Sequence, residues 1–165
     1  MESVLLQKLN DDLKTALRQG DRIKLDTLRL IVSAVQYAEI AEQKKLYDGG
    51  ADATAVQQKR LGDADVQAVI SKMVKQHHES IDMFRQGKRD DLVAREEAEL
   101  AVLETYQAKQ LSRAEISEAA RKVIADIGAK SPAETGKVMQ KLMPLLKGKA
   151  DGKDIAAVVG ELLKQ

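Results

Sequence analysis

The sequence predicts an all-α protein in which a multi-helix N-terminal domain is followed by a small bundle of three helices. Apolar residues recur every three or four positions along the 165-residue chain, and no segment shows the strict alternation that is typical of a strand. Glycine follows several of these periodic segments and a capping residue precedes several of them, as at the ends and starts of helices. We therefore expect two helical domains, residues 1–108 and residues 109–165.

The first two helices of the N-terminal domain are separated by Gly20 and Asp21. A leucine at every fourth position forms a stripe that ends at Gly20, a natural C-terminal cap, and Asp21 can cap the longer helix that follows. The segment DGGADATA (48–55) is rich in turn-forming residues and is predicted to be an exposed loop. The residues of these two helices that we expect to face the core are Leu5, Leu9, Leu13, Leu17, Ile23, Leu28, Ile31, Val35 and Ala38.

Two more helices complete the predicted N-terminal domain. One begins near Asp63 or Asp65 and ends at Gly87, and the other spans residues 90–106 with its acidic side chains outward. The apolar repeats on the two sides of residues 107–110 do not continue each other, so the domain boundary is placed there. The residues expected to face the core are Val66, Val69, Met73, Ile81, Phe84, Leu92, Leu103 and Tyr106.

The first and last helices of the C-terminal domain have clear start signals. Ser112 and Glu115 have the spacing of a capping box and open a helix that ends at Gly128. Asp151 and Asp154 have the same spacing at the start of the final helix. The core-facing residues expected on these two helices are Ile116, Ala120, Val123, Ile127, Ile155, Val158, Val159, Leu162 and Leu163.

The middle helix of this domain is bounded by two prolines. Ser131 is the expected cap, with Pro132 in the first turn and Glu134 three residues after the cap. Pro144 lacks the amide donor and clashes one turn back, so the helix is expected to kink or end near Met143. Its core-facing residues are predicted to be Val138, Met139, Leu142 and Met143.

Composition excludes several classes of function. The chain has no cysteine and therefore forms no disulfide, thiolate metal site or cysteine nucleophile. Its aromatic residues are Tyr37, Tyr47, Phe84 and Tyr106, too few for a surface that stacks splayed bases, so a nucleic acid would have to be recognised by phosphates and shape. The first residues carry acids without a long apolar core, and no stretch has the apolar length to cross a bilayer. We expect a cytoplasmic protein with no membrane partner.

No self-sufficient catalytic or metal-binding set is visible in the sequence. His77 and His78 diverge by about 100° on a helix, so they cannot both face one ion without another element. Asp82 stands where the zinc-protease pattern needs a second histidine. The acids of residues 90–104 alternate with Arg95 and fit a solvated helix face. With no nucleophile elbow or phosphate loop either, we predict no catalytic residue, no metal and no cofactor.

A local excess of lysine lies in the C-terminal domain. Residues 129–150 hold five lysines against one acid, a net charge of +4, whereas the whole chain carries +1. Lys137 and Lys141 are four residues apart and share the side of the predicted helix that is opposite its apolar arc. The charge pattern by itself also fits a lysine face that is merely solvated. The residues predicted to contact an anion are Lys130, Lys137, Lys141, Lys147 and Lys149, with close backbone approach at Gly136 and Gly148.

Three segments resemble the GatB/YqeY family. GKVMQKLMPLLKGKADG (136–152) is similar to the family tail, in which a Gly-Lys-Val-Met segment precedes a Gly-basic-Ala-Asp turn. LDTLRLIVSAVQYAEI (25–40) and QAVISKMVKQHHESIDMFRQGKRDDLVAREEAELAVLETY (67–106) resemble the free-standing YqeY-like members. The resemblance implies an all-helical N-terminal domain and a three-helix tail.

The tail also resembles the end of the GatB subunit of the glutamine-dependent amidotransferase that converts mischarged Glu-tRNA(Gln) or Asp-tRNA(Asn). In that enzyme the tail is implicated in holding tRNA, so the resemblance implies tRNA as a partner. The family label, carbon–nitrogen ligase with glutamine as amido donor, is not transferred, because the chain has no counterpart of the GatB catalytic body. Many relatives carry Leu-Pro after the tyrosine at the interdomain joint; here Gln107–Ala108 follow Tyr106, which permits the helix to run further.

Two hypotheses of function follow. The leading one is a tRNA-binding accessory protein of translation whose tail lysines contact the phosphate backbone. The rival is a helical adaptor that docks an amidotransferase or an aminoacyl-tRNA synthetase without direct RNA contact, which the near-neutral total charge and the acidic 90–104 helix favour. A metal-dependent enzyme built on His77, His78 and the nearby acids is a third possibility. The tRNA species, the protein partner and the oligomeric state stay open.

Overall fold

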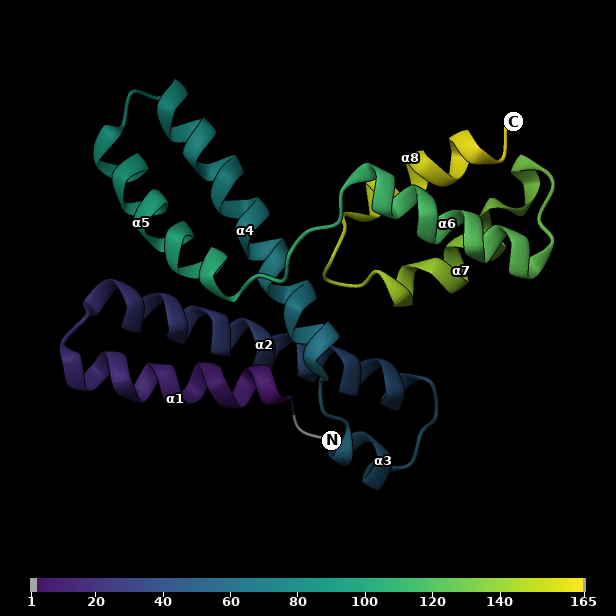
Figure 1. The fold of residues 1–165 in the computed structure, drawn as a ribbon. Helices are drawn as coiled ribbons and strands as arrows, with labels where there is room; N and C mark the ends of the chain where they lie inside the picture. The colour runs from purple at the N-terminus through teal and green to yellow at the C-terminus, as the bar shows by residue number, and fades with distance from the viewer. Residues whose placement is uncertain (1–2, 165) are drawn as a thin grey trace. The chain divides into compact units, whose positions relative to one another are not determined.

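The computed structural model describes residues 3–164, which form eight α-helices, one 3₁₀ turn and no strand (Figure 1). The predicted all-α class is therefore confirmed. Residues 1, 2 and 165, at the outer ends of the two predicted domains, lie outside the described range. The chain divides into two compact units, Met1–Gln107 and Ala108–Gln165, each with its own apolar core. Within the described range, every helix is too short or too polar to cross a bilayer.

The first unit is organised around its longest helix, which contacts the other four. In chain order its helices are α1 (Val4–Gln19), α2 (Arg22–Asp48), α3 (Ala53–Gln58), α4 (Asp63–Gln86) and α5 (Asp90–Tyr106). α2 contacts each of the other four helices, and α4 and α5 form an antiparallel pair (Figure 1). The buried residues of this core are Leu9, Ala16, Leu25, Leu28, Ile31, Val35, Leu61, Val66, Ile70, Val74, Ile81, Val93, Leu100, Leu103 and Tyr106.

The turn between α1 and α2 follows the predicted signals, but two predicted core residues are exposed. Gly20 adopts φ 71° and Asp21 accepts a hydrogen bond from the Lys24 amide at 3.1 Å. Leu17 and Ile23 are 57% and 52% exposed. A repeat of four residues advances 40° further than one helical turn at each step, so by its fourth leucine the stripe has rotated about 120° away from the core. On α2, Ile23 lies in the first turn, about 120° around the helix from the middle of the buried side.

The predicted loop at residues 48–55 is only partly a loop. Residues 49–52 lack helical structure, but Ala53 begins the short helix α3. Asp52 caps this helix by accepting hydrogen bonds from the amides of Thr54 and Ala55, at 2.9 and 3.0 Å. No side chain of α3 is buried, so the segment is exposed as expected and its helical content depends on its cap.

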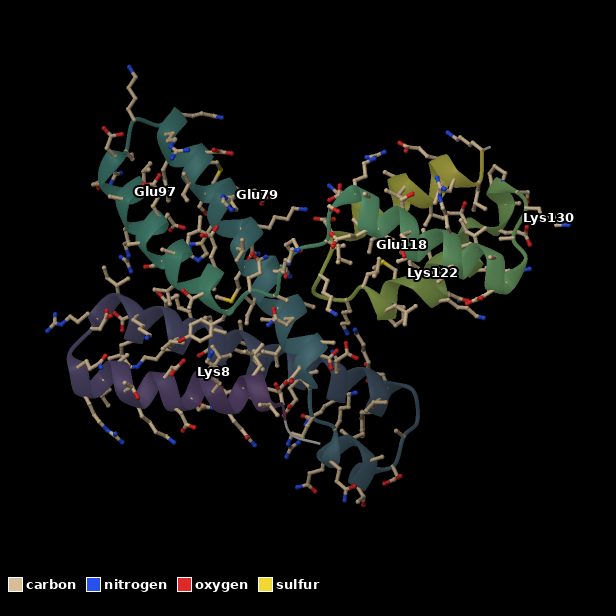
Figure 2. The ribbon with its side chains drawn as sticks, viewed as in Figure 1. Lys8, Glu79, Glu97, Glu118, Lys122 and Lys130 are labelled. Atoms are coloured by element: carbon tan, nitrogen blue, oxygen red, sulfur yellow. The ribbon has the colours of Figure 1, made fainter. Side chains whose placement is uncertain are left out.

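Tyr106, the last residue of α5, ties this helix to α1 and α4. Its hydroxyl donates to Asp12 Oδ2 at 2.8 Å, and its backbone carbonyl accepts from Gln67 Nε2 at 2.9 Å. Lys8 Nζ lies 5.7 Å from the centroid of the ring, and Figure 2 shows Lys8 on α1. The helix ends at Tyr106 because the backbone of Gln107 is extended, with φ −71° and ψ 132°. α5 therefore spans the predicted residues 90–106, although the missing proline would permit a longer helix.

The second unit contains three α-helices, of which the first begins with its predicted capping box. They are α6 (Arg113–Ile127), α7 (Thr135–Leu145) and α8 (Gly152–Leu162), and the 3₁₀ turn η1 (Pro132–Glu134) precedes α7. The capping box at the start of α6 is present, since the Ser112 amide donates to Glu115 Oε2 at 2.8 Å and Ser112 Oγ accepts from the Glu115 amide. The buried residues of this core are Ile116, Ala120, Val123, Ala129, Val138, Leu142, Leu146, Ile155, Val158, Val159 and Leu163.

The start of the middle helix differs from the prediction, whereas its end lies near the predicted position. Ser131 makes no side-chain cap; instead Glu134 Oε2 accepts from the Lys130 amide at 2.8 Å, and a 3₁₀ turn precedes the α-helix. The helix passes Pro144 and ends at Leu145, two residues beyond Met143. A proline in the last turn removes only one hydrogen bond, and Met143, predicted to be buried, is exposed.

A buried glycine shapes the turn between α7 and α8. Gly148 adopts φ 76° and its carbonyl accepts from Gln110 Nε2 at 3.1 Å. The neighbouring Lys149 donates its amide to the Leu146 carbonyl at 2.9 Å and accepts from the Leu111 amide at 2.8 Å. These bonds fix the backbone of the turn against the segment that leads into α6.

We predict that Tyr106→Phe lowers the free energy of unfolding by about 1–3 kcal/mol, because half-buried Asp12 loses its hydroxyl donor. Burial, and then the bond to Asp12, raises the pKa of Tyr106. Since the folded pKa lies above the unfolded one, this contribution is complete below about pH 10 and is lost as the pH rises further. Urea denaturation from pH 7 to pH 11 should show the difference between the two proteins shrinking above pH 10.

The matched control for this substitution is Tyr37→Phe, because Tyr37 is exposed and far fewer contacts depend on it. It should leave the free energy of unfolding unchanged at every pH. A difference between wild type and Tyr106→Phe that stays constant through pH 11 would contradict the account.

We predict that Gly148→Ala destabilises the second unit by about 1–2 kcal/mol, because a side chain is strained at φ 76°. Gly160→Ala is the control: Gly160 lies inside α8, and a methyl group there meets nothing within 4 Å. Thermal denaturation of the full chain should show a lower midpoint for Gly148→Ala and an unchanged or higher one for Gly160→Ala. Equal midpoints for the two variants would show that the turn does not require glycine.

Candidate functional site

The exposed side of α7 presents Lys137 and Lys141. Both are exposed, while Val138 and Leu142, each one position further along the helix, are fully buried. Because residues four apart are neighbours on a helix surface, the two ammonium groups lie on the same side of α7. The buried pair fixes the rotation of the helix about its axis, and thereby holds the two lysines in solvent.

Little negative charge opposes these lysines within the described residues. Lys137 Nζ lies 4.0 Å from Glu134 Oε1, and 76% of the Lys137 side chain is exposed, so the pair contributes little to stability. The Lys130 amide, and then the charge of Lys137, hold the pKa of Glu134 below its usual value despite opposing desolvation. Over residues 3–164 no acidic side chain forms an ion pair with Lys141 or Lys149.

Lys147 and Lys149 extend from the fixed turn on either side of Gly148. Both are exposed, whereas Gly148 between them is buried and has its carbonyl hydrogen-bonded to Gln110. Gly148 therefore determines the shape of the turn, and its carbonyl is not available to a ligand. Gly136 differs, because it is exposed and a methyl group there would meet nothing within 4 Å. Packing within the protein does not require a glycine at position 136.

Lys130 lies apart from the other predicted contacts. It precedes α7, and the helix of 11 residues separates it from the Lys147–Lys149 turn by about 16 Å. Figure 2 shows its side chain extending from the turn after α6. There it borders an open groove of about 440 Å³ whose wall also includes Arg121 and Leu162. Arg121 could not be predicted as part of this groove, because it is eight residues before the basic segment (129–150) and only folding brings the two together.

The two histidines do not share a site, as their spacing predicted. His78 is exposed, and its Nε2 lies 3.9 Å from Glu104. His77 is largely buried, and its Nδ1 lies 2.8 Å from Glu96 Oε2. The tail surface carries exposed cations, Lys137 and Lys141 among them, and such a surface is suited to binding an anion.

Comparison with known proteins identifies the sequence family. The Yqey-like protein family matches residues 6–163, nearly the whole chain. A protein of Pyrenophora tritici-repentis called altered inheritance of mitochondria protein 41, mitochondrial, is 29% identical over 90% of this chain and 75% of its own length. Proteins of the same name from Eremothecium gossypii and Saccharomyces cerevisiae are 34% and 32% identical over 62% and 59% of this chain.

These relatives correct one prediction. The expected cytoplasmic location is contradicted, because the curated relatives are named as mitochondrial proteins. The match spans only 49% and 45% of the Eremothecium gossypii and Saccharomyces cerevisiae proteins, so what those longer proteins do is not carried over from the likeness. The match over residues 6–163 nevertheless spans both helical units, and we conclude that this chain belongs to the Yqey-like protein family.

Proposed function

We propose that this protein binds structured RNA, with tRNA as the expected class, through the phosphate backbone. The observation that carries the proposal is the side of α7 that presents Lys137 and Lys141 opposite the buried Val138 and Leu142. An ammonium group held in solvent by a packed helix is positioned to replace the counterions of a phosphate. The resemblance of the tail to the end of the GatB subunit supports tRNA over other RNA.

The turn after α7 extends the same cationic surface along the chain. Lys147 and Lys149 flank a backbone that Gln110 and Leu111 hold in place, so these two side chains start from fixed positions. We define the tail ridge as Lys137, Lys141, Lys147 and Lys149. Its four cations would contact phosphates, and the scarcity of aromatic residues excludes specific stacking of bases. Binding should therefore depend on RNA shape more than on sequence.

We predict that affinity for tRNA falls with salt with a log–log slope of roughly −3 to −4, since four phosphate contacts release about that many counterions. Replacing any one lysine of the tail ridge by alanine should make the slope shallower by about one unit. Lys137→Glu with Lys141→Glu should weaken binding at least about tenfold at 0.1 M salt. Fluorescence anisotropy with labelled tRNA at several salt concentrations measures all three effects.

The matched control reverses two other charges of the same unit. Lys122 on α6, labelled in Figure 2, and Lys164 are exposed, and replacing both by glutamate changes the net charge by the same amount. This control should alter the affinity less than about threefold. If it weakens binding as much as the α7 variant does, the effect is one of total charge and the tail ridge is not the site.

We predict opposite effects on stability and binding at Gly136. Replacing it by alanine should stabilise α7 by about 0.5–1 kcal/mol, because the helix loses a glycine and the added methyl group has free space. The same methyl group should hinder a phosphate that approaches the backbone, and so lower tRNA affinity. Gly160→Ala should stabilise α8 similarly and leave affinity unchanged. If Gly136→Ala is stabilised but binds tRNA as wild type does, the backbone approach at Gly136 is wrong.

The adaptor hypothesis has support from one surface of the first unit. Leu30, Tyr37, Ile40 and Tyr47 of α2 are all exposed, and their spacing of three or seven residues places them on one side of the helix. Apolar side chains gathered on one side of a helix favour contact with another protein. Binding of a purified amidotransferase or synthetase that survives nuclease treatment and is lost in Tyr37→Glu would favour this second function.

A further inference from the structure

Three potential metal ligands meet between α4 and α5. The two helices are antiparallel neighbours (Figure 1); α4 contributes His77, and α5 contributes Glu96 and Glu99. The two glutamates are three residues apart and therefore lie on the same side of α5. One ligand atom from each of the three residues lies within 4.8 Å of the others.

The nitrogen of His77 that faces this cluster lacks a hydrogen bond. Among the described residues, His77 Nδ1 is the one buried side-chain nitrogen or oxygen without an aligned partner. It lies 2.8 Å from Glu96 Oε2, but no hydrogen bond joins the two atoms. A buried polar atom without a hydrogen bond is unfavourable. A cation bound by both atoms would give the nitrogen a partner.

We propose that His77, Glu96 and Glu99 form a binding site for one divalent transition-metal cation of the zinc type. An imidazole nitrogen with carboxylate oxygens is a donor set that suits such ions, whereas Mg²⁺ and Ca²⁺ prefer oxygen ligands alone. Ligand atoms around a tetrahedral zinc ion lie about 3.4 Å apart. The present spacings, from 2.8 Å between His77 Nδ1 and Glu96 Oε2 to no more than 4.8 Å within the trio, bracket that distance.

The surroundings of the three side chains suit a bound cation. Only 13%, 22% and 12% of the side chains of His77, Glu96 and Glu99 is exposed, so water competes weakly for the ion. Arg95 Nε donates to Glu99 Oε1 at 3.0 Å, which orients this carboxylate and compensates one of the two negative charges. Three protein ligands leave one position of a tetrahedral ion for water.

His78, the neighbour of His77, lacks the features of a metal ligand. His78 points to a different side of α4, its side chain is 57% exposed, and its nearest acid, Glu104, is 3.9 Å away. The spacing of the two histidines on one helix argues only against an ion shared by that pair. The trio does not follow from the sequence, because α5 supplies the other two ligands only after α4 and α5 have packed together.

Isothermal titration of the chelator-treated full chain with Zn²⁺ tests the proposal, with Mg²⁺ in a parallel titration. We expect one equivalent of Zn²⁺ to bind, at least about 100-fold more tightly than Mg²⁺, and to raise the melting temperature. His77→Ala should weaken Zn²⁺ binding at least about 100-fold, and Glu99→Gln, which preserves the shape of the side chain, at least about tenfold.

His78→Ala is the matched control and should bind Zn²⁺ as wild type does. Circular dichroism of each variant without metal shows whether it is folded; if His77→Ala is not, Glu99→Gln alone decides. Wild type that binds no stoichiometric Zn²⁺, a folded Glu99→Gln variant that binds as wild type does, or a His78→Ala variant as impaired as His77→Ala would each overturn the proposal.

Discussion

The burial of Val138 and Leu142 determines which side of α7 faces solvent, and the proposed function depends on it. Each side chain is fully buried, which contributes on the order of 2 kcal/mol apiece. Turning α7 so that Lys137 and Lys141 faced inward would expose both apolar residues and bury two charges without partners, which is far more unfavourable. The lysines are therefore held outward by the core of the second unit and not by contacts of their own. The positions of Lys137 and Lys141 are therefore defined even though these lysines take part in few ion pairs.

The helices could be predicted from sequence because their signals are local. Ser112, Glu115 and Gly128 act on amides and carbonyls within a few residues, and the structure places each in its predicted role in α6. Interactions between residues distant in sequence could not be predicted in this way. The hydrogen bond from Gln67 to the carbonyl of Tyr106, 39 residues later, has no local signal. The exposed Leu17 had the right spacing for a stripe, but the orientation of that stripe is set by the other helices.

In the candidate sites, too, features set by nearby residues could be predicted and features set by distant residues could not. The tail lysines are close together in the sequence, so their shared side of α7 follows from helix geometry alone. The groove beside Arg121 and Lys130 depends on how α6, the turn after it and α8 pack. It could not be predicted from composition. The structural role of Gly148 could not be predicted either. A glycine between two lysines is equally consistent with close approach of a ligand and with a tight turn. Its φ of 76° and its hydrogen bond to Gln110 favour the turn.

The match to the Yqey-like family covers both units. The two candidate sites are nevertheless independent, because one lies in each unit. The central claim concerns the second unit, and crosslinking tests it most directly. The full chain would be crosslinked to tRNA by ultraviolet light, digested, and its RNA-bearing peptides mapped by mass spectrometry. The account predicts that these peptides come from residues 131–150. Crosslinks confined to the first unit, or none above the level of an unrelated acidic protein, would contradict it.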